Sequence, residues 1–337
     1  MAHVVVIGAG LSGCTVACTL ADRGVDVTLV EKTGRIGGRV SSYGCKAVER
    51  CQNCGVCLTS GLWKKTADHK SIRIIKNTVV QDISGQPGSF SIKITGGKEN
   101  KYIKGIDTIV VSTGFDDLPG GISSHLHINN AEDIGEQGLM TGTQLEELLL
   151  KRTRSVLFEK RPESIAFIQC LGSRDKSEGG LYCSRVCCSY STRTAKLIRS
   201  YYPECKITFF YMELQNVEQG DFYNGLLELD MEFIKCRPAK ITGGDPLIVE
   251  YDDPAEGIKS REYDIIVLSN GIYACTDNGR HAEICGLGQD SNGFLRMADT
   301  GTGVYAAGCA KGPMKIDEAY ADAVAIAGKI LGEAGGK

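Results

Sequence analysis

The sequence predicts an α/β fold of two domains, with the second inserted into the first. The opening "HVVVIGAGLSGCTVACTLADRGVDVTLVEK" has an apolar run, a glycine turn, an amphipathic stretch and a second apolar run, which is a βαβ pattern. A second α/β pattern begins at "SIAFIQ", and the first resumes at "YDIIVLSNG" and ends with a helix from about Ile316 to Leu331. The predicted boundaries are residues 1–116 and 263–337 for the first domain and 117–262 for the inserted one.

The expected elements follow from apolar runs between turn residues. In the first domain we expect strands at "SIRIIKNTVV", "SFSIKIT" and "DTIVVSTGF". In the middle domain a helix at "SRVCCSYSTRTAKLIRSYY" precedes a strand "KITFFYM", a helix "NGLLELDM" and strands "MEFIKCRPAKIT" and "PLIVEYD". This alternation of strands and helices indicates a second α/β unit.

Composition excludes several classes of protein. The 337 residues carry a net charge of -3, so the chain offers no basic field for nucleic acid. The opening apolar run is short, and no run approaches the roughly 18 residues needed to span a bilayer. We expect a cytoplasmic protein with no membrane span.

A glycine motif marks a nucleotide site. Gly8, Gly10 and Gly13 form G-x-G-x-x-G between a predicted strand and helix, which suits a pyrophosphate at the helix N-terminus. Glu31 ends the next predicted strand, where a carboxylate reaches ribose hydroxyls. The alternative, a purely structural glycine turn, is weakened by this strand-helix-strand setting.

Later segments extend the motif to a flavin site. "GRIGGRV", "DTIVVSTGF" and "GVYAAGC" together resemble the flavoprotein family of thioredoxin reductase and glutathione reductase. The resemblance implies two dinucleotide-binding (Rossmann-like) domains, the second inserted into a split FAD domain. It also implies an aspartate near the ribityl chain where this sequence has Cys309. The predicted FAD-binding residues are Gly8, Gly10, Leu11, Ser12, Gly13, Glu31, Lys32, Gly37, Gly38, Arg39, Val80, Thr113, Gly114, Gly308, Cys309, Ile316 and Ala319.

Fifteen cysteines are many for a reducing compartment, so clustered ones are expected to bind metal or do redox chemistry. Six isolated ones are assigned to packing, as small apolar side chains: Cys14, Cys18, Cys205, Cys236, Cys275 and Cys285.

The middle domain has a cysteine cluster where a second glycine motif would stand. Cys170, Cys183, Cys187 and Cys188 follow the pattern C-x12-C-x3-C-C directly after the strand "SIAFIQ". Four thiolates can hold zinc or a 4Fe-4S cluster, and the adjacent pair suits zinc poorly. Arg174 and Arg185 would offset the negative charge of a cluster. Ordinary buried cysteines are the alternative.

This segment carries a more specific resemblance. "IQCLGSRD", "YCSRVCC", "FFYMEL", "GRVSSYGC" and "GVYAAGCAKGPMKI" are similar to the A subunit of heterodisulfide reductase and its bacterial relatives. The resemblance implies FAD, one 4Fe-4S cluster on the four cysteines, and partner subunits of a heterodisulfide reductase-like complex. It also implies a short form without the extra ferredoxin-like domains. A symmetric homodimer is expected.

A second cysteine group, Cys45, Cys51, Cys54 and Cys57, leaves three alternatives open: a second cluster, a redox disulfide, or a thiol-rich loop.

We therefore expect a FAD and 4Fe-4S electron-transfer oxidoreductase subunit in sulfur or anaerobic energy metabolism, with no catalytic acid-base residue. One alternative is a pyridine-nucleotide disulfide oxidoreductase with a redox dithiol within Cys51–Cys57. Another is a scaffold that keeps FAD without catalysis.

Overall fold

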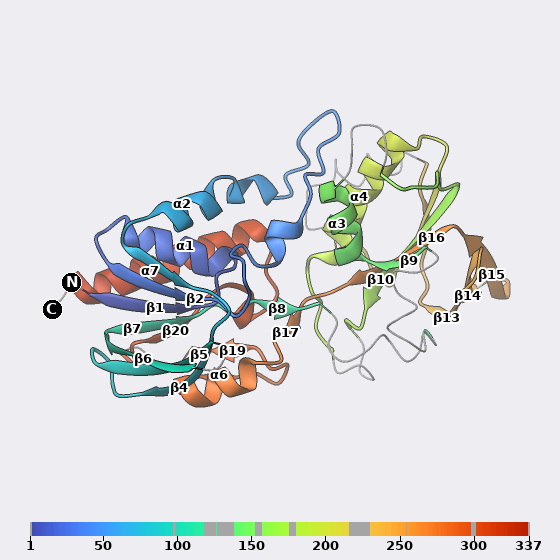
Figure 1. Cartoon of the computed structure of the whole chain (residues 1–337). Helices are drawn as coiled ribbons and strands as arrows, with labels where there is room; N and C mark the ends of the chain where they lie inside the picture. The colour runs from blue at the N-terminus through green and yellow to red at the C-terminus, as the bar shows by residue number, and fades with distance from the viewer. Residues whose placement is uncertain are drawn as a thin grey trace. The chain divides into compact units, whose positions relative to one another are not determined.

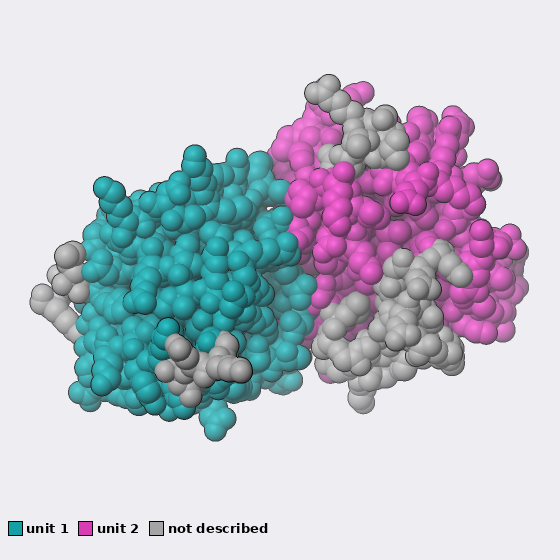
Figure 2. Space-filling model, in the orientation of Figure 1, with its two compact units in different colours: residues 1–41, 55–116, 274–337 teal, residues 42–54, 117–273 magenta. Residues whose placement is uncertain are grey.

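The structure, a computed structural model, describes residues 2–96, 99–117, 126, 138–151, 157–174, 180–215, 230–253, 255–297 and 301–335. The chain divides into two units that interleave along the sequence (Figure 2). Unit 1 contains residues 1–41, 55–116 and 274–337, and unit 2 contains residues 42–54 and 117–273.

Short apolar strands form the central sheet of unit 1, as expected for parallel strands covered on both faces (Figure 1). Its order is β20-β7-β1-β2-β3, and every neighbouring pair is parallel. The five strands are β1 (His3–Ile7), β2 (Asp26–Val30), β3 (Ile72–Ile75), β7 (Thr108–Val111) and β20 (Val304–Ala306).

Alternating side chains of this sheet build two core layers in unit 1. Val4 and Val6 face the helices α1 (Leu11–Ala21) and α7 (Ile316–Gly335), while Val5 and Ile7 pack toward an antiparallel sheet. That second sheet is β4-β5-β6, with strands Val79–Ser84, Phe90–Gly96 and Glu99–Ile106. The remaining elements are η1 (Arg39–Ser42), η2 (Val56–Thr59), α2 (Leu62–Asp68), β8 (Phe115–Asp116), α6 (Asn278–Cys285), β18 (Gly288–Gln289), β19 (Leu295–Arg296) and η5 (Gly308–Lys311).

Unit 2 repeats this plan with different strands. Its parallel sheet has the order β12-β11-β10-β16-β9, and its antiparallel sheet is β13-β14-β15. The parallel strands are β9 (Leu139–Thr141), β10 (Ser164–Leu171), β11 (Lys206–Phe210), β12 (Glu232–Ile234) and β16 (Ile265–Asn270). The others are β13 (Pro238–Thr242), β14 (Leu247–Asp253), β15 (Gly257–Tyr263), β17 (Tyr273–Ala274), α3 (Gly142–Lys151) and α4 (Cys187–Tyr201).

The two sheets have matching central strands. In unit 1, β1 lies between the next strand along the chain, β2, and the strand that follows the antiparallel sheet, β7. In unit 2, β10 lies in the same way between β11 and β16. The turn after β10 therefore corresponds in topology to the glycine turn after β1.

The predicted α/β fold with two Rossmann-like sheets is confirmed, with local corrections. The runs "SIRIIKNTVV" and "MEFIKCRPAKIT" each divide into two strands of different sheets, β3 with β4 and β12 with β13. Asn77, with φ of 51°, turns the chain in the first run. In the second run, β12 ends before Pro238, which cannot donate to a ladder. The helix expected at "NGLLELDM" falls largely outside the described residues.

Five of the six cysteines assigned to packing are buried, and Cys236 is half-buried. No helix in the described part of the chain is long and apolar enough to cross a membrane.

Candidate functional site

The predicted FAD residues of unit 1 gather at one edge of its sheet. Gly8 follows β1, Glu31 follows β2, Thr113 follows β7 and Gly308 follows β20. Parallel strands end at the same edge, and in open α/β sheets this edge is where ligands bind. The structure thus brings together residues separated by up to 300 positions in the sequence.

In the glycine turn, protein atoms fill the space beside the first and third glycines, whereas the space beside the second is open. A Cβ on Gly8, whose φ is 101°, would lie 2.5 Å from the Ser112 carbonyl oxygen. A Cβ on Gly13 would lie 1.9 Å from the Gly8 oxygen. For Gly10 the nearest heavy atom would be 3.9 Å away, the Cα of Gly38. The second glycine therefore faces space, as close approach of a pyrophosphate requires.

The N-terminus of α1 also suits a phosphate. Gly10 caps this 11-residue helix, which begins at Leu11, without a side-chain hydrogen bond, and no acidic residue lies in the first turn. Its leading backbone N–H groups and the positive end of the helix dipole are therefore not neutralised by a carboxylate of that turn.

Glu31 ties the glycine turn to the end of β2. Its Oε2 accepts a hydrogen bond from Ala9 N at 2.8 Å, and its Oε1 accepts from Thr33 N and Oγ1, both at 2.8 Å. A carboxylate offers about four acceptor positions, so one remains for a ribose hydroxyl.

The segment "GRIGGRV" closes over the glycine turn. Gly37 N donates to Ala9 O at 2.7 Å, and a Cβ on Gly38 would lie 2.9 Å from Gly10 Cα. Arg39 Nε donates to Phe115 O at 2.9 Å, with the guanidinium above the Phe115 ring. These contacts hold the predicted residues against the turn after β1.

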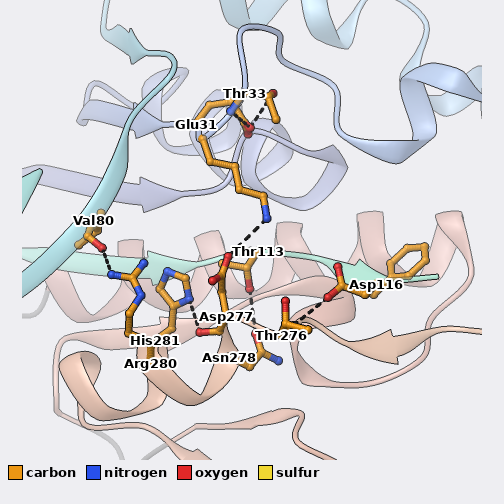
Figure 3. A network of polar contacts seen from close by, with 12 residues as sticks. Glu31, Thr33, Val80, Thr113, Asp116, Thr276, Asp277, Asn278, Arg280 and His281 are labelled. Atoms are coloured by element: carbon orange, nitrogen blue, oxygen red, sulfur yellow. Dashed lines mark hydrogen bonds and ion pairs between the residues drawn. The ribbon is translucent and has the colours of Figure 1, made fainter. Parts of the chain in front are cut away.

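A polar network that the sequence did not reveal lies beside this edge (Figure 3). Thr113 Oγ1 donates to Asn278 Oδ1 at 3.1 Å, and Lys32 pairs with Asp277 at 3.4 Å. Arg280 Nη1 donates to the carbonyl oxygen of Val80. The predicted FAD residues Thr113, Lys32 and Val80 thus contact α6 or the residue before it. The only feature of the sequence that indicated this part of the site was the polar run "TDNGRH".

The closing segment meets the same edge. Gly308, with φ of 66°, donates its N–H to Asp322 Oδ2 at 2.7 Å, and Ser12 Oγ donates to Ala319 O at 3.4 Å. Burial raises the pKa of Cys309 to about 12, and Asp322 adds to that rise. A carboxylate therefore does lie near Cys309, but it comes from α7, where no motif in the sequence indicated it.

In unit 2 the four clustered cysteines lie where the glycine turn lies in unit 1. Cys170 is near the carboxyl end of β10, and Cys187 and Cys188 begin α4, as the sequence predicts. The thiols of Cys170, Cys187 and Cys188 are buried, while Cys183 is half-buried.

The four thiols are close enough to act on one another electrostatically. Burial raises the pKa of Cys170 to about 11, with further contributions from Cys188 and Cys183. Burial raises the pKa of Cys187 well above its usual value, and all three other thiols add to the rise. Arg174 opposes the rise at Cys170 and Cys188. A cation bound by the four sulfurs would remove this repulsion.

The backbone around these cysteines is strained. Cys170, Arg174 and Arg185 all have left-handed φ, between 58° and 63°, which costs a non-glycine residue about 1 kcal/mol or more. The strain is held by buried hydrogen bonds: Ser184 Oγ contacts Ser173 Oγ at 2.8 Å and accepts from Ile272 N at 2.9 Å. Strain of this kind concentrates at functional sites.

The sulfurs are gathered but not arranged as a coordination sphere. Among the described residues, no three or more His, Cys, Asp or Glu side chains are placed to hold a metal ion together. The donor set fits an iron-sulfur group by its chemistry, because it offers four thiols, and two of them, Cys187 and Cys188, begin α4 at an N-terminus without a side-chain cap.

The turn after β10 differs from the glycine turn in one further respect. A Cβ on Gly172 would lie 1.8 Å from the hydroxyl of Tyr273, which donates to Leu171 O at 2.9 Å. The phenol fills the space beside this glycine, whereas the space beside Gly10 is open. At Gly172 the backbone is therefore not open to a pyrophosphate, as it is at Gly10.

The second cysteine group belongs to two units. Cys45, Cys51 and Cys54 lie in the loop 42–54 of unit 2, and Cys57 lies in unit 1. Cys51 and Cys57 are exposed, and Asn53 N donates to Cys51 Sγ at 3.4 Å. The iron content per chain separates a cluster here from a disulfide or free thiols.

The loop 42–54 is fixed to unit 2 by buried charges. Lys46 forms an ion pair with Glu146 of α3 at 2.6 Å, and the two side chains are 3% and 8% exposed. Arg193 of α4 donates to Gln52 O at 2.7 Å and to Asn53 O at 3.2 Å. The loop with Cys51 is thus tied to the helix that begins with Cys187.

Comparison with known structures defines the class of the fold. A family model described as an NAD(P)-binding Rossmann-like domain matches residues 6–60. Thioredoxin reductase of T. acidophilum superposes with a TM-score of 0.67 at 17% identity, covering 98% of both chains. An NAD-dependent persulfide reductase from A. fulgidus superposes with a TM-score of 0.63 at 18% identity, covering 98% of this chain and 59% of that one. The fold is that of thioredoxin reductase, with two Rossmann-like sheets.

Sequence comparison is more specific. The chain is 28% identical to an iron-sulfur A subunit of the CoB–CoM heterodisulfide reductase of Methanopyrus kandleri, over 97% of this chain and 63% of the relative. It is 26% identical to the A subunit of the H2:CoB–CoM heterodisulfide, ferredoxin reductase of Methanothermobacter thermautotrophicus, over 96% of this chain and 62% of the relative. The resemblance to the A subunit of heterodisulfide reductase is thereby confirmed over nearly the whole chain.

The chain spans less than two thirds of the length of these relatives. The first alignment extends over 421 positions against 337 residues here, so that relative has additional segments within the aligned region.

Replacing Lys46 with methionine should lower the free energy of unfolding by about 3–5 kcal/mol, because it leaves the Glu146 carboxylate buried without this cation. The double variant Lys46→Met/Glu146→Leu should recover most of this loss. The matched control is Lys65→Met, whose partner Asp22 lies in a pair with 51% and 44% exposed side chains; it should cost at most about 1 kcal/mol. Urea unfolding measures all three, and a double variant no more stable than Lys46→Met would contradict the prediction.

Proposed function

We propose that the chain is a FAD and 4Fe-4S electron-transfer subunit of a heterodisulfide reductase-like complex. The observation that carries the proposal is the position of Cys170, Cys183, Cys187 and Cys188. In unit 2 they take the place that the glycine turn has in unit 1. A unit built to bind a dinucleotide has thiols at its ligand-binding edge, which favours a metal cluster in place of a nicotinamide.

The residues of unit 1 fit FAD. The open side of Gly10 and the N-terminus of α1 would receive the pyrophosphate, and the remaining acceptor position of Glu31 would receive a ribose hydroxyl. FAD bound there would exchange electrons in ones and twos. Thr113, Gly114, Gly308 and the start of α7 lie at the same edge and would support the flavin end.

The residues of unit 2 fit an iron-sulfur group. The raised pKa values of three buried thiols mean that the protein alone disfavours thiolates at this place. Bound iron would reverse that preference, and Arg174 and the N-terminus of α4 would offset the remaining negative charge.

The proposed partner proteins are inferred from the names of the relatives. The relatives are each named as one subunit of a heterodisulfide reductase, so other subunits of such a complex are the proposed electron donors and acceptors. A homodimer and a place in sulfur or anaerobic energy metabolism in the cytoplasm belong to the same proposal.

Iron, acid-labile sulfide and flavin per chain, measured in anoxically purified protein, test the cofactor content. We expect about four irons per FAD, lost in Cys187→Ala. Cys205→Ala is the matched control, because Cys205 is also buried in unit 2 but lies after the C-terminal end of α4, directly before β11; it should keep its iron.

The same measurement tests the second cysteine group. About eight irons, halved in Cys187→Ala, would mean that Cys45, Cys51, Cys54 and Cys57 hold a second cluster. Absence of iron from the unaltered protein would refute the proposal.

Gly10→Ala and Gly13→Ala form a matched pair for the FAD site. The alanine methyl at position 10 meets no described protein atom closer than 3.9 Å, so the variant should fold normally but bind FAD at least about tenfold more weakly. At position 13 the methyl would lie 1.9 Å from Gly8 O, so this variant should be destabilised by about 1–3 kcal/mol or more. Flavin fluorescence and thermal unfolding separate the two, and normal FAD affinity in Gly10→Ala would contradict the assignment.

The alternative is a pyridine-nucleotide disulfide oxidoreductase, which thioredoxin reductase-like structures favour. The filled space beside Gly172 counts against it. We expect that NADH and NADPH leave the flavin absorbance unchanged under anoxic conditions, whereas dithionite bleaches it. Prompt bleaching by either nucleotide would favour the alternative, and failure of dithionite would favour a scaffold.

A further inference from the structure

Gln169, the residue before Cys170, has an unusual environment. Its side chain is 3% exposed, and neither its Nε2 nor its Oε1 has a hydrogen-bond partner in the described part of the chain. Among the described residues it is the only buried amide side chain with both polar atoms unbonded, because Gln52 and Asn270 each lack a partner at one atom only. Burial of an unbonded amide costs about 1–3 kcal/mol, so such a group requires a partner.

The strand pattern shows which face Gln169 occupies. Ile165 and Phe167 belong to the core layer beneath α3 and α4, while Ala166 and Ile168 face the antiparallel sheet. The ladder with β16 becomes irregular between Ile168 and Leu171, and the left-handed residue in that interval is Cys170. Gln169 therefore ends the regular alternation, on the face covered by the helices.

Neighbouring residues place Gln169 under the first turns of α4. Ile168 pairs with Leu268 and Leu171 with Asn270, so Gln169 lies near Ser269, the β16 residue between these two partners. Ser269 Oγ contacts Ser191 Oγ of α4 at 2.9 Å. Cys187 is one helical turn before Ser191, toward the carboxyl edge of the sheet.

We propose that the carboxamide of Gln169 donates a hydrogen bond to a sulfur of the iron-sulfur group held by the clustered cysteines. The inference rests on the proposed function and deepens it. The carboxamide lies at the end of β10 on the face covered by α4, at the end of the sheet toward which Cys187 of α4 lies. No described group of the protein forms a hydrogen bond with it. Hydrogen bonds to cluster sulfurs stabilise the more negative, reduced form and so raise the reduction potential.

The test uses Gln169→Leu in the full chain, which keeps the volume and removes the donor. Thr194→Val is the matched control, because the Thr194 hydroxyl is buried on α4, which covers this face of β10, but donates to the Tyr190 carbonyl of α4 itself at 2.8 Å. Iron content, the midpoint potential followed by electron paramagnetic resonance, and the melting temperature of metal-free protein are measured for each.

We expect Gln169→Leu to keep its iron and to shift the ratio of reduced to oxidised cluster about tenfold toward the oxidised form at a fixed applied potential, which is about 59 mV for a one-electron couple. Thr194→Val should leave the potential unchanged. Metal-free Gln169→Leu should melt at a higher temperature than the unaltered protein, because it removes an unbonded amide.

The outcomes separate this inference from the function on which it rests. No iron in the unaltered protein overturns both. Iron present with an unchanged potential in Gln169→Leu, or lost from that variant, overturns the role of Gln169 alone. A metal-free Gln169→Leu variant that melts at a lower temperature than the metal-free unaltered protein also overturns the role of Gln169, since it would reveal a hydrogen-bond partner of Gln169 within the protein.

Discussion

Parallel strands end at a common edge of their sheet, and both units of this chain depend on that constraint. In unit 1 it brings Gly8, Glu31, Thr113 and Gly308 together from four separate parts of the sequence. In unit 2 it brings Cys170 against the start of α4. The chemistry of each site then depends on which residues occupy the turn after the central strand. In unit 1 the open side of Gly10 leaves room for a ligand's phosphates. In unit 2 the Tyr273 phenol fills the space beside Gly172, and the cysteines offer sulfur as a ligand.

The sequence predicted those parts that rest on short-range patterns. The glycine motif, the strand that leads to Cys170 and the position of Cys187 and Cys188 at a helix start all depend on neighbours close along the chain. What it missed depends on contacts between distant segments. Asn278 meets Thr113, and Asp322 meets Gly308, only because the sheet brings α6 and α7 to its carboxyl edge. The divided strands were missed for a related reason, since each turn within them changes the sheet to which the chain belongs.

The cysteine segment combines features that would each be unfavourable alone. Left-handed Cys170, Arg174 and Arg185 and the unbonded amide of Gln169 reduce the stability of unit 2, and burial disfavours the thiolates that would bind a metal. A ligand that offers positive iron to the thiols and sulfur to the amide would offset two of these costs together. Local conflict that a cofactor relieves is a physical reason for a fold to retain it.

The loop 42–54 has a consequence for the chain's modularity. It interrupts unit 1 in sequence yet belongs to unit 2, so the polypeptide passes between the units four times. A fragment made of residues 117–273 alone would lack Lys46 and Gln52, and would deprive Glu146 and Arg193 of these partners. Unit 2 is therefore not a continuous module that can be excised or exchanged by cutting at its two outer boundaries.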